Sequence, residues 1–159
     1  MGVLFTTGRD PCDEARELCR ALAAVMPESA CENRGKKTVE DVVARARLFG
    51  LKRAAIIASE GGKASEISFA SVTGKSWEWV GTPVKIKSAA FSGLPKEKPC
   101  CAEFSGKRAS EWRNFFEVEE CCPSCDGDSG FGTLSVECGE KFLRFEVSGR
   151  KVGPELVLA

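Results

Sequence analysis

The fold is indicated first by a stretch near the start of the sequence, Val3-Leu4-Phe5-Thr6-Thr7-Gly8-Arg9-Asp10-Pro11. Its apolar first residues predict a short buried strand. Asp10 and Pro11 are typical of a helix N-terminus, as N-cap and first helical residue. Apolar residues at helical spacing then continue to Met26. The stretch therefore predicts a strand that leads through a polar turn directly into an amphipathic helix.

The same alternation of strand and helix continues through the first half of the chain. Residues 30–32 are a short strand candidate. Thr38 and Asp41 approximate a capping box and predict a second helix that ends at Gly50, with Phe49 on its buried face. Residues 53–59 contain an unbroken apolar run, which is typical of a central strand. With one more strand after it, the order βαβαββ indicates an α/β fold.

The second half is richer in strands. Strands are predicted at residues 77–91, 100–104 and 155–158, and a helix at 109–116. Two alternating runs within residues 134–147 flank Gly139-Glu140, which predicts a hairpin with a type II′ turn.

Composition excludes several classes of function. Lys and Arg total 23, Asp and Glu total 23, and the chain has no His. Without His, neither a Ser-His-Asp nor a Cys-His mechanism can be built from this chain. No apolar run approaches the length of a membrane span, and the first residues do not resemble a secretory signal. We therefore expect a cytoplasmic globular protein.

The zero net charge hides two segments of opposite sign. Residues 34–53 hold seven cationic and two acidic side chains, whereas residues 117–140 hold seven acidic side chains and no Lys or Arg. Lys and Arg supply most of the non-specific affinity for nucleic-acid phosphates. The basic segment thus predicts a phosphate-binding surface, and the acidic segment 117–140 predicts contact with a basic protein partner.

Two strand-to-helix turns share one pattern. Thr6-Thr7-Gly8-Arg9 precedes the first helix, and Ser105-Gly106-Lys107-Arg108 precedes the helix of the second half. Each places hydroxyls, a glycine and a cation where free backbone N–H groups favour anions. This similarity is consistent with a duplication.

Three motifs together resemble the Brix domain, in the compact archaeal form that consists of little else. They are Thr6-Thr7-Gly8-Arg9 between strand and helix, Asn33-Arg34-Gly35-Lys36 before a helix, and Val152-Gly153-Pro154 before the last strand. The resemblance covers nearly the whole chain. It departs from the family pattern at Gly8, where the family usually has Ser, and at Glu155, where it generally has Arg.

The resemblance implies a single Brix domain over residues 1–159, made of half-domains 1–75 and 76–159. Each half would resemble an anticodon-binding domain, with mixed sheets flanked by helices. The implied function is that of a non-catalytic, cofactor-free factor that binds ribosomal RNA in ribosome biogenesis and pre-rRNA processing. The acidic segment 117–140 would then contact ribosomal or assembly proteins. The residues expected to contact RNA are Thr6, Thr7, Arg9, Arg34, Gly35, Lys36, Lys37, Lys107 and Arg108.

Three alternatives remain open at this point. The half-domain fold would also suit an accessory module that binds tRNA at the anticodon. The zero net charge and Glu155 would suit a protein-interaction module without direct RNA contact. A small enzyme is the least favoured, because the chain has no P-loop, no GxGxxG and no His.

Nine cysteines in a chain of this kind are expected to be mostly reduced thiols. Cys122 and Cys125 have zinc-knuckle spacing and could recruit Cys138 with Cys100 or Cys101 as further ligands. A second CxxC is missing, and acidic neighbours raise the pKa of a thiol. We therefore expect an accessory loop with ordinary thiols and no metal.

Trp77 and Trp79 are candidates for stacking on unpaired bases. Burial in the core is the commoner role of such side chains. The two are expected to point in opposite directions from their strand, so that one of them could be a stacking surface.

Overall fold

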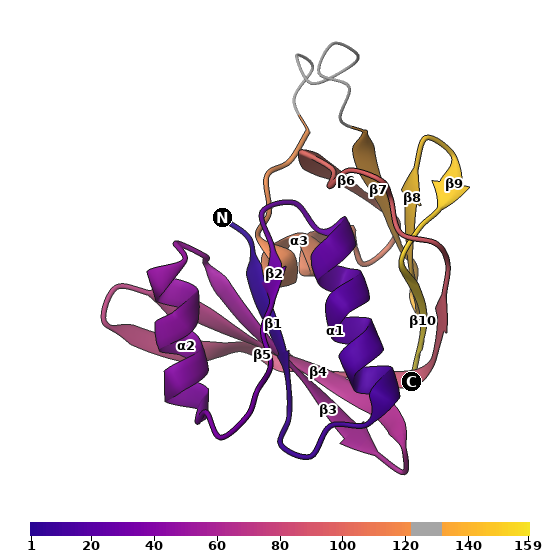
Figure 1. Ribbon diagram of the computed structural model, residues 1–159. Coiled ribbons are helices and arrows are strands. Elements are labelled where there is room, and N and C mark those ends of the chain that lie inside the picture. Colours follow the sequence, from indigo (N-terminus) through magenta and orange to yellow (C-terminus); the bar gives the residue numbers. More distant parts are fainter. Residues whose placement is uncertain (122–131) are drawn as a thin grey trace.

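The structure is a computed structural model that describes residues 1–121 and 132–159. Within these residues, three helices flank one mixed sheet of ten strands (Figure 1). The elements of the first half are β1 (Val3–Thr7), α1 (Asp13–Val25), β2 (Ala30–Cys31), α2 (Val39–Leu48), β3 (Arg53–Glu60) and β4 (Lys63–Thr73). Those that follow are β5 (Ser76–Phe91), β6 (Cys101–Ser105), α3 (Ala109–Phe116), β7 (Thr133–Cys138), β8 (Phe142–Val147), β9 (Arg150–Lys151) and β10 (Pro154–Leu158).

The two halves of the sheet repeat one pairing scheme. In the first half, β1 pairs with β3 in parallel, and β4 and β5 follow as antiparallel neighbours. In the second half, β6 pairs with β7 in parallel, and β8 and β10 follow as antiparallel neighbours. A helix follows β1 and another follows β6. The expected α/β fold of two similar halves is confirmed, and its mixed sheets form one continuous sheet.

The strand β5 joins the two halves. Its first part, Ser76–Lys85, pairs with β4, and its last part, Ile86–Phe91, pairs with β10. The division of the chain into residues 1–75 and 76–159 stays a prediction. In the structure, the long strand after that division contributes to both halves of the sheet.

The main core lies around α1 and α3. One cluster of buried side chains takes residues from both of these helices and from strands of both halves, including Leu22, Phe69, Trp112, Leu134 and Phe145. A smaller cluster lies under α2, which Figure 1 shows apart from the other two helices. Because the main cluster draws on both halves, neither half can form its core without the other.

Two helix ends differ from expectation. Cys12, and not Asp10, is the N-cap of α1, and its Sγ accepts the Ala15 N–H. Asp10 instead has a φ of 54°, a left-handed conformation in the turn before the helix. The capping box of Thr38 and Asp41 is confirmed. Phe49, however, is half exposed, because α2 ends at Leu48 and the backbone turns away from the core there.

The predicted hairpin of the second half is confirmed as β7 and β8, but its turn is not type II′. Such a turn needs Gly139 at its first position with a positive φ, and Gly139 has none. Its N–H donates to the Phe142 carbonyl, so it lies on the strand side of the turn. A Cβ at Gly139 would overlap the Phe142 ring. A larger residue here would therefore require this ring to move.

Trp77 and Trp79 lie on the same face of β5, not on opposite faces. Side chains two residues apart on a strand point the same way, so the expectation was wrong on geometry. The two rings meet edge to face with centroids 5.1 Å apart. Trp77 packs against the cluster under α2, whereas Trp79 is 48% exposed.

Arg53, at the start of β3, is a buried cation that joins the first half to α3. Its side chain is 8% exposed, and its Nη1 lies 2.7 Å from a carboxylate oxygen of Glu117. Its Nε donates to the Asn114 carbonyl at 3.1 Å. The buried charge is therefore both paired and hydrogen-bonded, as burial of an ion requires.

We predict that Arg53→Ala lowers the free energy of unfolding by about 2 kcal/mol, because it removes charge-assisted hydrogen bonds and leaves the Asn114 carbonyl without its donor. Urea unfolding followed by circular dichroism measures the change. Arg47→Ala is the matched control, since Arg47 is exposed and its side chain donates a hydrogen bond only to the Ser76 carbonyl among the described residues. Equal stability of the two variants would contradict the structural role of Arg53.

No helix among the described residues is long and apolar enough to cross a membrane.

Candidate functional site

A cavity of about 710 Å³ opens at the carboxyl end of β1, beside the start of α1. Four arginines line it: Arg9 from the turn after β1, Arg16 and Arg20 from α1, and Arg34 from the turn after β2. The remaining lining residues are Thr7, Gly8, Asp10, Pro11, Cys19, Cys31, Glu32, Asn33 and Gly35. A concave surface with this many guanidinium groups favours a ligand with several negative charges.

Arg34 has a structural role at this cavity. The residue is 8% exposed, its Nε donates to the Lys37 carbonyl at 2.7 Å, and its Nη1 donates to the Thr7 carbonyl at 3.0 Å. These bonds fix the turn after β2 against the end of β1. Burial lowers the pKa of the Arg34 guanidinium, and the nearby charge of Arg9 lowers it further. An anion bound in the cavity would relieve this repulsion between the two guanidinium groups.

The arginine side chains, and not the amides of the helix N-terminus, carry the argument for an anion. The Gly8 N–H donates to the Ile57 carbonyl, and the Ala15 N–H donates to the cap sulfur of Cys12. The first turn of α1 also carries Asp13 and Glu14. These acidic groups already complement the positive end of the helix dipole.

Two acidic residues, Asp10 and Glu32, line the cavity, and the charge of Glu32 is largely compensated. The Glu32 carboxylate accepts a hydrogen bond from the Arg45 Nε at 2.9 Å. This bond is the main reason that the pKa of Arg45 is raised. Glu32 also accepts through its backbone carbonyl, which lies 2.7 Å from the Thr6 hydroxyl. Glu32 therefore removes little of the positive charge that the four arginines give the cavity.

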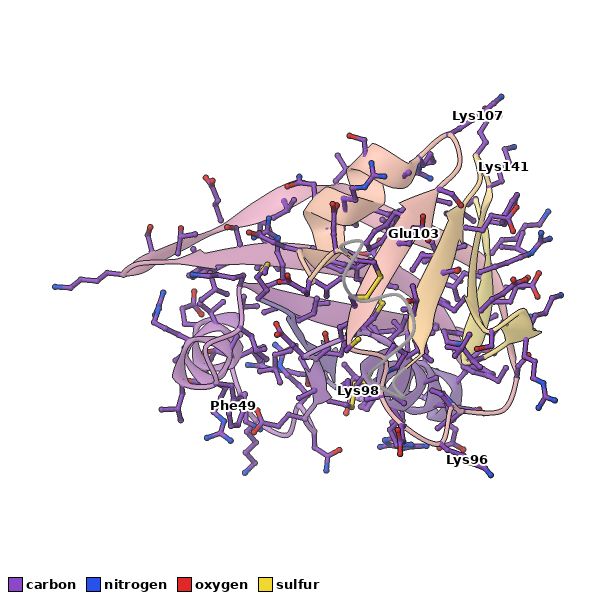
Figure 2. The ribbon with its side chains drawn as sticks, turned by 90° about the horizontal axis from the view of Figure 1, so that it is seen from above. Phe49, Lys96, Lys98, Glu103, Lys107 and Lys141 are labelled. Carbon is purple, nitrogen blue, oxygen red and sulfur yellow. A yellow bond between two sulfur atoms is a disulfide. The ribbon has the colours of Figure 1, made fainter. Side chains whose placement is uncertain are left out.

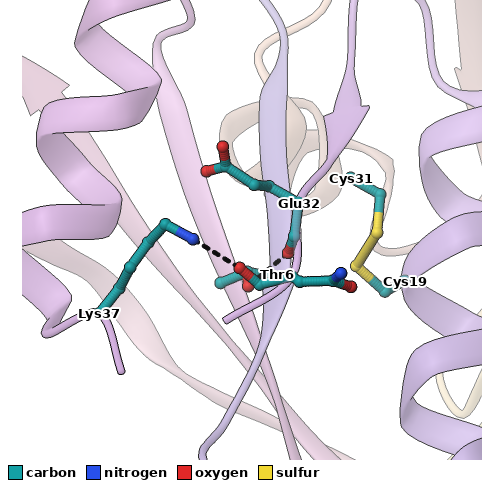
Figure 3. The surroundings of a disulfide bond; sticks show 6 residues. Thr6, Cys19, Cys31, Glu32 and Lys37 are labelled. Atoms are coloured by element: carbon teal, nitrogen blue, oxygen red, sulfur yellow. Dashed lines mark hydrogen bonds between the residues drawn. A yellow bond between two sulfur atoms is a disulfide. The ribbon is translucent and has the colours of Figure 1, made fainter. Parts of the chain in front are cut away.

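A disulfide crosses between two walls of the cavity. Cys19 of α1 is bonded to Cys31 of β2, with Cα atoms 6.0 Å apart. Figure 3 shows this bond on the side of β2 that faces α1, while Lys37 approaches from the other side. A second disulfide joins Cys101 to Cys121. The expectation of mostly reduced thiols missed both pairs, because only strand pairing brings these cysteines together.

The second predicted anion site is built differently. Arg108 binds both carboxylate oxygens of Glu111 at 2.7 Å, and Lys107 lies 3.9 Å from a carboxylate oxygen of Glu140. The bond to Glu111 is the largest cause of the raised pKa of Arg108. Figure 2 shows Lys107 pointing into solvent near Lys141. Neither Lys107 nor Arg108 lines the arginine cavity.

The structure brings four of the predicted residues to one cavity, namely Thr7, Arg9, Arg34 and Gly35. Thr6 is buried, and its hydroxyl is used within the fold. Lys36 is exposed in the turn beside Gly35, and the Lys37 Nζ donates to the Asn33 carbonyl at 2.7 Å. RNA contact by all of these residues stays a prediction.

Sequence reasoning missed Arg16 and Arg20. They are four residues apart on the face of α1 opposite its apolar stripe, so they lie one helical turn from each other. Their spacing places both on one side of the helix, but only the orientation of α1 after the turn Thr7-Gly8-Arg9 brings them to the carboxyl end of β1.

The cysteines proposed as zinc ligands are only partly described. Cys122 and Cys125 lie outside the described residues. Of the others, Cys101 is in a disulfide, Cys100 is exposed, and Cys138 is buried. Burial raises the pKa of the Cys138 thiol to about 12. No cluster of metal-ligating residues occurs in the part of the chain that the structure describes.

The acidic segment 117–140 is less free than its sequence indicates. Its residues 122–131 lie outside the described part of the chain. Among the rest, ion pairs join Glu117 to Arg53, Glu120 to Arg113, and Glu137 to Arg144. A protein partner for this segment stays a prediction.

We predict that Arg34→Ala destabilises the fold by about 2 kcal/mol, since two charge-assisted hydrogen bonds to carbonyls are lost. Arg34→Lys is expected not to restore stability, because an ammonium cannot donate along both directions of the guanidinium fork. Urea unfolding measures both variants. Lys36→Ala is the control, with no measurable change expected, and a comparable loss in that control would refute the assignment.

We also predict that Cys138 resists alkylation in the folded protein. Only the thiolate reacts, and a thiol with a pKa near 12 is almost fully protonated at pH 8. Iodoacetamide treatment followed by peptide mass spectrometry should label Cys100 first and Cys138 only after denaturation. Equal labelling rates at these two positions in the native protein would contradict the burial.

Comparison with known proteins gives a match of structure alone. No family model and no curated protein matches the chain. A probable ribosomal biogenesis protein from Aeropyrum pernix K1 has a TM-score of 0.82 at 20% identity, over 99% of this chain and 95% of that chain. Mil, an archaeal Imp4-like protein, has a TM-score of 0.66 at 21% identity, over 98% of this chain and 95% of that chain.

At this level of identity, the shared property is the fold. Both matches extend over nearly the full length of each chain, so they include both halves of the sheet. The chain therefore has the fold of an archaeal Imp4-like protein, and the resemblance to the Brix domain is confirmed as a likeness of fold.

Proposed function

We propose that this protein is a non-catalytic ribosome-biogenesis factor that binds ribosomal RNA. The observation that carries the proposal is the cavity lined by Arg9, Arg16, Arg20 and Arg34. The chain has the fold of a protein named for ribosomal biogenesis and of an Imp4-like protein, and this likeness supports the same role. A role in pre-rRNA processing would follow from holding an RNA segment in place, without a chemical step by this chain.

The proposed mechanism is electrostatic. Arg34 is fixed by its bonds to Thr7 and Lys37, so its charge is part of the cavity before any ligand binds. Arg9 and Arg20 are exposed at the rim and can fold onto a phosphate. One guanidinium group can bind two oxygens of the same phosphate. Consecutive phosphates of one strand would therefore engage different arginines. The exposed Lys36 and the half-buried Lys37 would extend this contact along the turn after β2.

The two predicted phosphate sites should contribute unequally. Arg108 already has a carboxylate partner in Glu111, and an RNA phosphate would have to compete with it. Of the four arginines of the cavity, Arg16 lies 3.3 Å from the Asp13 carboxylate, and the other three have no ion pair among the described residues. We therefore place the main RNA contact in the first half and a weaker one at Lys107 and Arg108.

We predict that the triple variant Arg9→Ala/Arg16→Ala/Arg20→Ala binds rRNA fragments more weakly and with a smaller salt dependence. The slope of log K against log salt is negative, and each phosphate contact that is lost reduces its magnitude by roughly 0.7 to 0.9. Fluorescence anisotropy with labelled rRNA fragments at several salt concentrations gives this slope. Three arginines in contact with phosphates would thus reduce it by about two.

The control removes three exposed cations from other parts of the surface, Lys75, Lys87 and Arg150. A general polyanion effect would reduce the slope equally in both triple variants and would refute a localised site. Competition with tRNA in the same assay addresses the alternative of an anticodon-binding module. If tRNA displaced the rRNA fragments at equal concentration, the proposed preference for rRNA would be wrong.

A further inference from the structure

A bulge in β5 interrupts the sheet beside Trp79. Phe69 of β4 pairs with Val80, and Ile67 pairs with Val84. Gly81, Thr82 and Pro83 of β5 therefore lie opposite a single residue of β4. Gly81 has a φ of 59°, which glycine adopts without strain, and Pro83 has no N–H to give to a ladder. Bulges of this kind redirect side chains and are common next to binding sites.

A cavity of about 320 Å³ lies at this bulge. It is separate from the arginine cavity and shares no residue with it. Its wall is mostly apolar, with two hydroxyl-bearing residues. The lining residues are Ser68, Phe69, Trp79, Val80, Gly81, Thr82 and Pro83.

The exposure of Trp79 is not explained by packing. Trp112, the tryptophan of α3, is fully buried in the main core, and Trp77 packs against the cluster under α2. Trp79 is 48% exposed at the mouth of the cavity, where it contacts Trp77 only edge to face. An indole in this position presents a large apolar surface beside the cavity, which is available for stacking.

We propose that this cavity binds one unpaired nucleobase of a single-stranded RNA, stacked on the indole of Trp79. The proposal rests on the RNA-binding function proposed above and adds a second, chemically different contact to it. A volume of about 320 Å³ is at the lower limit of small-molecule sites and suits a single ring system. Ser68 and Thr82 bring hydroxyls that can donate to or accept from the edge of a base.

The same geometry disfavours an extended peptide. Over Trp77–Val84 the strand partners of β5 among the described residues all lie in β4, so the other edge of this stretch is the place where a peptide strand would add. The bulge and Pro83 disrupt the regular spacing that such an addition needs. A flat ring needs no backbone ladder and can use the indole directly.

The test compares Trp79→Leu with the wild type on two RNA probes. One is a short single-stranded oligouridylate, and the other has the same length and phosphates but abasic riboses. Stacking on one aromatic side chain contributes roughly 1 to 3 kcal/mol, so Trp79→Leu should weaken binding of the oligouridylate about 5- to 150-fold. Both proteins should bind the abasic probe equally. Trp79→Phe should retain most of the affinity, and thermal melting confirms that the variants are folded.

Salt dependence separates this contact from the arginine cavity. Stacking releases no counterions, so Trp79→Leu should lower log K by the same amount at every salt concentration and leave the slope unchanged. The arginine triple variant changes the slope. Quenching of tryptophan fluorescence by the oligouridylate should also be lost in Trp79→Leu.

Each outcome decides one of the two proposals. If the wild type binds neither probe, the RNA-binding function fails. If the wild type binds both and Trp79→Leu weakens both equally, or weakens neither, RNA binding stands and the base-stacking site is wrong. The base-stacking site would also be wrong if an apolar peptide quenched the tryptophan fluorescence of the wild type without RNA, while Trp79→Leu left RNA affinity unchanged.

Discussion

The rest of the structure depends on the backbone ladder of β5. This one strand satisfies the hydrogen bonds of β4 along its first part and those of β10 along its last part. The two halves are therefore held by main-chain bonds as well as by side-chain packing. The position of α1 and α3 in one shared core follows from this, because both halves of the sheet must face the same helices to bury their apolar sides.

Ion pairs, more than position in the sequence, determine which charges of the molecule remain free. Of the basic stretch 34–53, Arg45 is bound to Glu32 and Arg53 to Glu117, so neither is available as a free cation. The unbalanced charge lies instead where β1, α1 and the turn after β2 meet. The same principle applies at Glu155, where the Brix-like pattern generally has Arg. Bonds to Arg144 and Lys151 lower the pKa of this carboxyl, so its charge is compensated locally.

Much of the fold could be predicted from the sequence because its signals are local. The alternating strands, the capping box at Thr38 and the helix at residues 109–116 all depend on neighbours in the chain. The errors have non-local causes. Gly139 lies against a ring that approaches from the facing strand, and Cys19 meets Cys31 only after β2 has paired with β1.

The candidate site was predicted in part for the same reason. Arg9 and Arg34 stand in recognisable motifs, and the structure brings them to one cavity. Arg16 and Arg20 carry no motif and become part of the site only through the orientation of α1. The bulge at Gly81-Thr82-Pro83 weakens the alternation of apolar and polar residues in the sequence. Its cavity, however, depends on the register of β5 with β4.

The position of Arg53 has a consequence for synthesis on the ribosome. Its hydrogen-bond partner Asn114 lies 61 residues later in the chain, and the Gly2 N–H likewise donates to the carbonyl of Glu117. At the usual rates of translation, roughly 3 to 12 s pass between the emergence of Arg53 and that of its partner. During this interval the first half has a guanidinium in β3 that cannot yet be buried with its counterion. The contacts of Gly2 and Arg53 with Asn114 and Glu117 can therefore form only after α3 has left the exit tunnel.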